Sequence, residues 1–318
     1  MFRNITMTGL LLTLLVGGVG RAAQAKNVAP LKGTITLSGA FALYPMVQTW
    51  AEEFRKIHPE VKFDVTAGGA GKGITDALTA VVDVGMVSRE IHDAEIKQGA
   101  WFVPVTKDAV VPVANAANPV WSEMGKRGLK KQAFAAIWID ESVTTWEQAL
   151  GFSGNTSITV YTRSDSCGAA ETWALYLGKK QEDLAGVGVF ADPGIAEAVR
   201  KDVRGIGFNN VNYAYDAGTK RPVAGLRIIP IDLNGNGRIE PAENFYDTRD
   251  HLMKAIAEGR YPSPPARDLY FVTKGKPAKP ILRAFIQWVL TDGQKYAPAA
   301  GYIPLAQGKL KDSLTKLK

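Results

Sequence analysis

Residues 68–73 form a glycine-rich turn that could bind an anion through its backbone. The segment reads GGAGKG, and apolar residues at helical spacing follow at positions 74–81, so the turn leads into a helix. The first N–H groups of a helix have no partner inside it, and the helix dipole makes that end positive. Because glycines let a ligand come close to these amides, the turn predicts a site for an oxyanion.

Two more strand-to-helix turns carry residues suited to the same ligand. Residues 39–45 (GAFALYP) follow an apolar run, and residues 163–170 (RSDSCGAA) precede an apolar helix. Ligands of α/β sheets bind beyond the carboxyl ends of the strands, where such turns meet. Arg163 could give an oxyanion two N–H groups while Asp165 orients it. Alternatively, Arg163 and Asp165 form an ion pair that only holds the turn.

The single cysteine, Cys167, stands at the predicted start of a helix. A helix N-terminus lowers the pKa of a thiol, which is the setting of a nucleophile. However, no general base lies near it in sequence, and the three histidines have surface-like surroundings. The alternative, which we favour, is a small residue in the binding loop of a protein that is not an enzyme.

Residues 232–243 (DLNGNGRIEPAE) fit the twelve-residue calcium loop D-x-N-x-N-G-x-I-x-x-x-E. The predicted calcium ligands are Asp232, Asn234, Asn236, the backbone carbonyl of Arg238, and Glu243. Two asparagines in place of carboxylates predict a modest affinity, and the lack of a paired loop predicts a structural ion. The alternative is a calcium-free Asn-Gly turn. No organic cofactor is expected.

The first 25 residues have the pattern of a signal peptide. Arg3 precedes an apolar run at residues 10–19, and residues 22–25 (AAQA) end in an A-x-A cleavage pattern. The apolar run is shorter than a membrane-spanning helix, and no later run is long enough. No cysteine stands at the cleavage point for lipid attachment. We therefore predict a soluble periplasmic protein without membrane insertion, with a retained N-terminal anchor as the alternative.

The charge of the chain argues against nucleic-acid binding. The formal charge of +7 falls to +5 without residues 1–25, which hold two arginines and no acidic residue. Lysines and arginines are scattered along the sequence rather than gathered into a stripe. This mild positive charge permits an attraction for anions and does not by itself demonstrate one.

Strand-like apolar runs alternate with helical patterns, which predicts an α/β fold with mostly parallel sheets. The length after the leader, about 290 residues, suggests two lobes of ordinary domain size. The predicted strands are residues 33–38, 61–65, 102–105, 110–115, 157–161, 206–208, 227–231 and 268–273. The clearest predicted helices are residues 46–58 and 281–290, and residues 116–150 are helical and polar.

Several segments resemble, in order and spacing, the phosphate-binding protein of the high-affinity phosphate ABC transporter. They are SGAFALYPMVQTWAEEF, GGAGKGI, VDVGMVSREI, VPVTKDAVVPVANAANP, TTWEQALG, RSDSCGA and RDLYFVTKG…FIQWVLTDGQKYAPAAGYIPL. The resemblance implies the type II periplasmic binding protein fold, with two α/β lobes joined by a two-strand hinge and the ligand cleft between them. It implies lobe 1 at residues 26–113 and 266–318, lobe 2 at residues 114–265, and crossovers near residues 110–115 and 265–272.

The resemblance also implies a set of ligand-binding residues. They are Ala40, Phe41, Ala42, Ala70, Gly71, Ser88, Arg89, Arg163, Asp165, Cys167, Gly168 and Ala169. The family uses hydroxyls of the three turns beside backbone amides, and this chain has lost them. Apolar residues fill the first turn, and alanine replaces the serine of the glycine turn. In the third turn the family pattern R-x-D-x-S-G-T reads RSDSCGA, so that Cys167 replaces the serine and Ala169 the threonine. Ser88 stands where the family has a carboxylate that accepts the proton of hydrogen phosphate.

These departures weaken the expected selectivity for phosphate. Each lost hydroxyl donor to a charged ligand costs roughly 1.5–3 kcal/mol. We therefore expect a site that discriminates less between phosphate and sulfate-like or molybdate-like ions, or that prefers a bulkier anion. The predicted function is capture of a small tetrahedral oxyanion, phosphate foremost, by a monomer that serves an ABC permease. The alternative is a periplasmic sensor or interaction module that binds a different anion.

Overall fold

The computed structural model describes Met1 and residues 30–318. The predicted signal peptide lies, apart from Met1, outside the described residues. Residues 31–318 form one compact unit. Within the described part of the chain, no helix has the length and apolar character needed to cross a membrane.

Eight strands pair in the order β2-β1-β3-β9-β4-β7-β5-β6, and a ninth strand, β8, lies off this path and pairs with β4. The ends of the path are parallel, since β1 pairs in parallel with β2 and β3, and β5 pairs in parallel with β6 and β7. Its middle is antiparallel, because β9 and β4 run against each other and against their other neighbours. The prediction of mostly parallel sheets is therefore right at the ends and wrong in the middle.

The strands are β1 (Gly33–Gly39), β2 (Val61–Ala67), β3 (Val84–Val87), β4 (Ala100–Asn115), β5 (Thr159–Arg163), β6 (Val187–Val189), β7 (Gly205–Asn210), β8 (Leu226–Ile228) and β9 (Ala266–Lys274). The α-helices are α1 (Tyr44–Ile57), α2 (Ala70–Leu78), α3 (Asp93–Lys97), α4 (Trp121–Arg127), α5 (Lys131–Trp138), α6 (Trp146–Leu150), α7 (Gly168–Leu177), α8 (Ala191–Lys201), α9 (Val211–Ala214), α10 (Arg249–Ala257), α11 (Pro280–Val289) and α12 (Gln307–Leu317).

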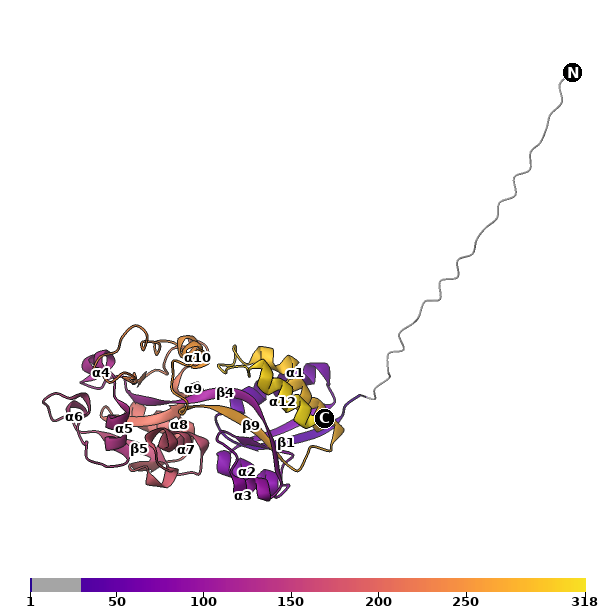
Figure 1. The fold of residues 1–318 in the computed structure, drawn as a ribbon, viewed down its shortest axis with the longest axis horizontal. Coiled ribbons are helices and arrows are strands. Elements are labelled where there is room, and N and C mark those ends of the chain that lie inside the picture. Colours follow the sequence, from indigo (N-terminus) through magenta and orange to yellow (C-terminus); the bar gives the residue numbers. More distant parts are fainter. Residues whose placement is uncertain (2–29) are drawn as a thin grey trace. The chain divides into compact units, whose positions relative to one another are not determined.

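Strands β4 and β9 connect the two halves of this unit (Figure 1). The sequence suggested two separate strands in residues 102–115, but β4 is one strand of 16 residues. Its polar segment 106–108, which looked like a break, pairs with Arg267, Asp268 and Leu269 of β9. Residues 106–108 can thus be polar and still belong to a continuous strand, because their backbone pairs with the neighbouring strand β9.

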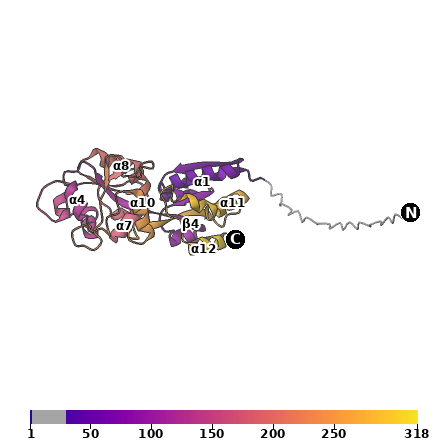
Figure 2. The ribbon, with the colours of Figure 1, turned by 90° about the horizontal axis from the view of Figure 1, so that it is seen from above.

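The buried hydrophobic side chains of this unit form two separate clusters. One, which we call the core of lobe 1, includes Trp50, Phe271 and Phe285. The other, the core of lobe 2, includes Trp138 and Trp173. Figures 1 and 2 show α1, α11 and α12 on the first side and α4, α7 and α8 on the second. Each lobe therefore buries its own core, and only β4 and β9 carry backbone from one core to the other by strand pairing.

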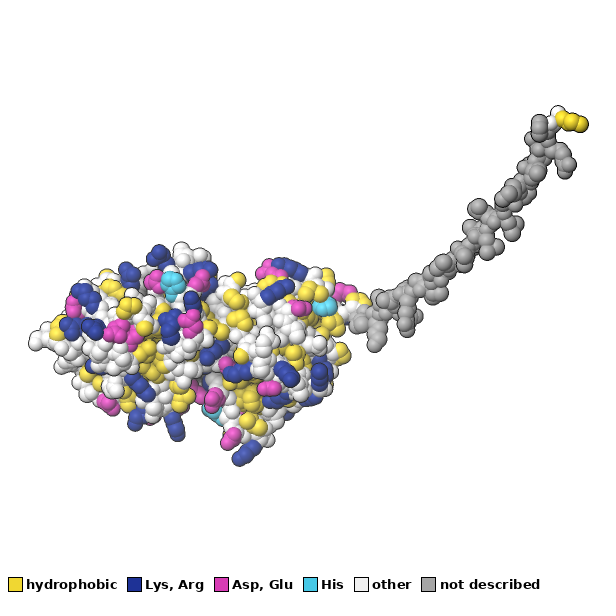
Figure 3. Space-filling model, turned by 45° about the horizontal axis from the view of Figure 1, so that its top comes forward, with side chains coloured by type: hydrophobic (Ala, Val, Ile, Leu, Met, Phe, Trp, Pro, Cys, Tyr) yellow, Lys and Arg dark blue, Asp and Glu magenta, His cyan; other side chains and the backbone are white. Residues whose placement is uncertain are grey.

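Helices α10 and α12 were not predicted. Helix α12 reads QGKLKDSLTKL and buries only Leu310, Ser313 and Leu317, which gives too weak an apolar period to recognise. Lysines and arginines are spread over the face that Figure 3 shows, as the sequence suggested.

Candidate functional site

The three strand-to-helix turns meet at the boundary between the lobes. The N–H groups of Gly68 and Gly69 donate to the carbonyl of Gly39 at 2.8 and 3.1 Å, which joins the first turn to the glycine turn. The N–H of Gly71 donates to the carbonyl of Ser166 at 3.2 Å, which joins the glycine turn to the third. The structure thus brings together three segments that the sequence alone could only suggest as neighbours.

Backbone amides remain available where these turns meet. Helix α2 begins at Ala70 and α7 begins at Gly168. Their N–H groups, and those of Phe41 and Ala169, have no acceptor among residues 30–318. First-turn amides of a helix are the donors that bind anions in many proteins. Ala40, Ala42, Ala70 and Ala169 are all buried and have no polar side chain to offer a ligand. The N–H of Ala40 already donates to the carbonyl of Met86 at 2.8 Å.

Arg163 is held by two carboxylates rather than one. Its Nε and Nη2 donate to Asp165 at 2.8 and 2.6 Å, and its Nη1 donates to Asp192 at 2.7 Å. The side chains of Arg163 and Asp192 are each 1% exposed. Burial alone would lower the pKa of Arg163, but the two carboxylates, Asp192 foremost, outweigh it and raise the pKa. The group of three side chains therefore carries a formal charge of −1, and three of the five N–H bonds of Arg163 are in use.

Asp192 was missed by the sequence analysis. It lies in the first turn of α8, and it also accepts hydrogen bonds from the backbone N–H and the side-chain amide of Asn210 at 3.1 and 2.6 Å. An aspartate in the first turn of a helix is an ordinary feature. Nothing in the sequence pairs it with an arginine 29 residues earlier.

Phe41 lies against Arg163 and two aromatic residues of lobe 2. The guanidinium carbon of Arg163 is 5.8 Å from the centre of the Phe41 ring. The Phe41 ring meets Phe190 and Tyr213 edge to face, with centroids 6.1 and 6.4 Å apart. The Tyr213 hydroxyl also donates to the Phe41 carbonyl at 3.2 Å. Neither Phe190 nor Tyr213 was predicted, because isolated aromatic residues in sequence read as packing residues.

Ser88 and Arg89 have different positions although they are neighbours. Ser88 is buried against α7, so close that a Cβ placed on Gly168 would lie 2.2 Å from its carbonyl oxygen. Arg89 is bound instead by Glu95 at 2.9 and 2.6 Å and by Glu171 at 3.0 Å. The guanidinium that the sequence offered as a ligand group is thus already paired, and one partner, Glu171, joins lobe 1 to lobe 2.

Cys167 corrects one expectation. Its side chain is buried, and that burial raises the pKa of the thiol to about 12, rather than lowering it as a helix N-terminus would. Its Sγ accepts a hydrogen bond from the N–H of Ala170 at 3.5 Å. Loss of solvation, which raises the pKa, outweighs the nearby Arg163 charge and the hydrogen bond from Ala170, which lower it. Cys167 therefore caps α7 as a small residue, and its burial disfavours the thiolate that a nucleophile needs.

A buried chain of polar groups links Arg163 to the hinge. Arg267 of β9 donates through Nη1 to the carbonyl of Gly168 at 2.7 Å and through Nη2 to the side-chain oxygen of Asn210. Its Nε lies 3.2 Å from Asp108, its register partner on β4. Burial raises the pKa of Asp108 to about 7, although Arg267 opposes the shift. Asp108 and Arg267 are charged residues inside apolar strands, and this pattern could have predicted that they pair. The pair was not predicted.

The calcium-type loop is folded by its own predicted ligands. Asp232 accepts hydrogen bonds from the N–H groups of Gly235 and Gly237, both at 2.8 Å, and Glu243 accepts from Leu233 at 2.8 Å. Asp232 and Glu243 are buried. The described residues hold no cluster of three or more His, Cys, Asp or Glu side chains placed to hold a metal. The predicted set contains only two such residues beside two asparagines and a carbonyl, so calcium stays a prediction.

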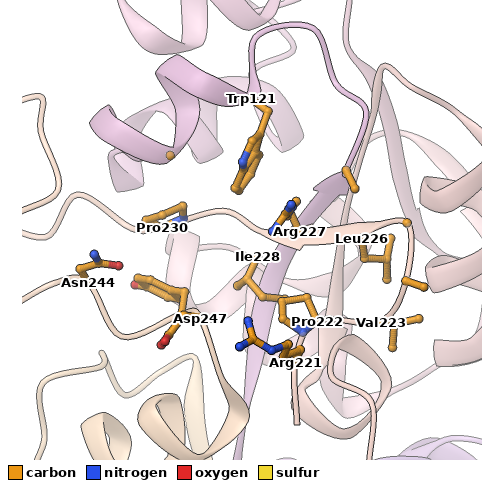
Figure 4. Close-up of a pocket in the computed structure, with 15 residues that line it drawn as sticks. Trp121, Arg221, Pro222, Val223, Leu226, Arg227, Ile228, Pro230, Asn244 and Asp247 are labelled. Atoms are coloured by element: carbon orange, nitrogen blue, oxygen red, sulfur yellow. The ribbon is translucent and has the colours of Figure 1, made fainter. Parts of the chain in front are cut away.

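A surface pocket of about 410 Å³ lies beside this loop, in lobe 2 (Figure 4). Trp121 and Arg227 face one another across it, with the guanidinium carbon 5.8 Å from the ring centre. Pro230 and Asn244, which flank the calcium-type loop, form part of its wall. None of the residues at the three turns lines it.

The arrangement of two cores, a two-strand hinge and converging turns can be compared with known proteins. A family model described as a PBP superfamily domain matches residues 24–293. The chain belongs to the PBP superfamily. This confirms the fold class inferred from the resemblance.

Curated relatives in this superfamily are distant but cover most of the chain. Protein SphX of Synechococcus elongatus is 24% identical over 302 residues, covering 89% of this chain and 83% of SphX. The phosphate-binding protein PstS of Pseudomonas aeruginosa is 25% identical over 332 residues, covering 92% of this chain and 93% of PstS. The second of these names describes a binding protein rather than an enzyme.

Solved structures share the fold. A phosphate ABC transporter substrate-binding protein with bound phosphate from Clostridium perfringens superposes with a TM-score of 0.70 at 19% identity, covering 86% of this chain and 100% of that one. An ABC-type phosphate transport receptor from Vibrio cholerae gives a TM-score of 0.60 at 21% identity, covering 85% and 99%.

Proposed function

We propose that this PBP-superfamily protein captures a tetrahedral oxyanion, phosphate foremost, between its two lobes. The observation that supports this most directly is the convergence of three turns at which the N–H groups of Phe41, Ala70, Gly168 and Ala169 have no acceptor among the described residues. The names of relatives such as phosphate-binding protein PstS support the same class of ligand.

Backbone amides would do most of the binding. The hydroxyl donors of the resembling family are absent, and Arg163 is shared between Asp165 and Asp192. Ser88 in place of a carboxylate removes a repulsion against fully deprotonated dianions. We therefore expect phosphate, sulfate and molybdate to compete for this site with similar affinities.

The cellular role follows from the family and the leader pattern. We propose that residues 1–25 direct export to the periplasm, where the monomeric chain delivers its ligand to an ABC permease without catalysing a reaction. The buried thiol of Cys167, with its pKa raised to about 12, supports a role in binding rather than nucleophilic catalysis.

Isothermal titration calorimetry of the exported chain, freed of bound anion by unfolding and refolding, tests the proposal. We expect at least two of phosphate, sulfate and molybdate to bind, with dissociation constants within about tenfold of one another. Chloride at the same ionic strength is the control for nonspecific charge effects. Binding of none of these oxyanions would overturn the proposed function, and tight binding of phosphate alone would overturn the predicted loss of selectivity.

We also propose that residues 232–243 bind a structural calcium ion. The supporting observations are the agreement of the segment with the loop pattern and the burial of Asp232 and Glu243. Calcium should raise the melting temperature of the wild type, and Glu243→Gln should abolish that increase. Glu52→Gln, which changes an exposed carboxylate of α1 outside the loop, should leave it intact. Identical melting temperatures in calcium and in chelator would refute the calcium site.

A further inference from the structure

An aromatic cluster borders the proposed oxyanion site. We define it as Phe41 of the first turn, Phe190 before α8, and Tyr213 of α9. The Phe41 ring contacts both others edge to face, so the cluster contains residues of both lobes. The side chain of Phe190 is 61% exposed. An exposed aromatic ring beside the proposed site offers a surface against which the organic part of a ligand can pack.

The backbone next to Phe190 is strained in a way that holds this arrangement. Ala191 has a φ of 65°, the left-handed region that residues with a Cβ rarely adopt. Its N–H donates to Asp165 at 3.2 Å, the same carboxylate that holds Arg163. The strained residue therefore connects the position of Phe190 to the charged group of the site. Strain of this kind persists where surrounding contacts maintain it, often at ligand-binding segments.

Charge at the site gives an inorganic dianion little advantage. The two negative charges of Asp165 and Asp192 exceed the single positive charge of Arg163 by one unit, and all three side chains form ion pairs with one another. Arg89 is likewise paired by Glu95 and Glu171. A ligand must therefore gain affinity from the free amides and from contacts other than net charge. The aromatic cluster offers such contacts, since aromatic rings attract apolar and aromatic groups.

We propose that the preferred ligand is an oxyanion with an organic substituent, of the phosphonate or phosphate-monoester class, and that Phe190 and Phe41 determine this preference. The proposal rests on the proposed function of the same cleft. The oxyanion group is bound by the helix-start amides of Ala70 and Gly168, and the substituent lies against the aromatic cluster. An organic cation would suit the rings and the carboxylates but would leave those amides without an acceptor.

The test compares ligands that share a head group and differ in their substituent. Inorganic phosphate, methylphosphonate, phenylphosphonate and tetramethylammonium are titrated calorimetrically into the wild type. We expect phenylphosphonate to bind at least tenfold more tightly than inorganic phosphate, with methylphosphonate between them. Phosphate binding as tightly as phenylphosphonate would overturn this inference and leave the proposed function intact. Binding of tetramethylammonium alone, or of no oxyanion, would overturn both.

Variants assign the preference to the aromatic cluster. Phe190→Ala should weaken phenylphosphonate at least tenfold and inorganic phosphate less than twofold, because only the substituent contacts that ring. Val203→Ala is the matched control, since Val203 is an apolar residue with 50% exposure outside the cluster. Phe41→Ser, which restores a hydroxyl to the first turn, should narrow the ratio between the two ligands. Equal losses for both ligands in Phe190→Ala would contradict the assignment.

Discussion

The glycine turn and the Arg163 turn meet at the boundary between the lobes, and they are held in place by different interactions. The glycine turn offers amides near one exposed ion pair, between Lys72 and Asp76. The Arg163 turn offers amides above a buried cluster of three charges that continues through Asn210 to the hinge. The first region is set by local backbone geometry and the second by charges from distant segments.

The difference shows where side-chain charge matters in this cleft. An exposed ion pair is screened by water and contributes little to stability. A buried charge that loses its partner is costly, because nothing replaces its lost hydration. The Arg163 turn should therefore be the more sensitive region to mutation, and the glycine turn the more tolerant, except where a side chain would block contact between the lobes.

The largest expected effect is that of Arg163→Met. It leaves Asp165 and Asp192 without their counter-charge, and should lower the free energy of unfolding by about 3–5 kcal/mol. The matched variant in the glycine turn is Lys72→Met, which breaks a pair whose lysine side chain is 47% exposed and should cost under about 1 kcal/mol. Urea unfolding followed by circular dichroism measures both. Equal losses would remove the distinction between the two turns.

A second variant, Asp108→Asn, tests the hinge end of the buried chain. The pKa of Asp108 is raised from 3.8 to about 7, so the protonated form is favoured in the folded state. Its stabilising contribution is therefore complete below pH 3.8 and is lost as the pH rises to about 7. The difference between wild type and variant should change by up to roughly 4 kcal/mol across this interval. A difference that stays constant from pH 4 to pH 8 would contradict this role.

The smallest expected effect concerns closure of the lobes. A Cβ on Gly168 would lie 2.2 Å from the backbone oxygen of Ser88, whereas a Cβ on Gly71 would lie 2.6 and 2.9 Å from the side-chain atoms Oγ and Cβ of Ser166 and 3.2 Å from its backbone oxygen. Gly168→Ala should therefore weaken anion binding tenfold or more, about 1.4 kcal/mol, and Gly71→Ala should have a smaller effect. Gly308→Ala, with no atom near its added Cβ, is the control. Wild-type affinity in Gly168→Ala would show that the cleft does not close through this contact.

Much of the fold could be predicted from local patterns. The strand before each turn and the helix after it follow from apolar periodicity, which reports the face that each element buries. The continuity of β4 could not be predicted, because residues 106–108 are polar and their partners lie about 160 positions away on β9. Helix α12 was missed because few of its residues are buried.

The candidate site likewise has features that could be predicted from the sequence and features that could not. The sequence by itself determined the glycine turn, the absence of hydroxyls at the three turns and the calcium-type loop, because each depends on residues adjacent in the chain. Three facts came only from the tertiary structure. Asp192 is a second carboxylate bound to Arg163, burial raises the pKa of the Cys167 thiol, and the Phe190 ring lies beside the Phe41 ring. Charge balance and solvation depend on every group within a few ångströms, and those groups come from segments that only folding brings together.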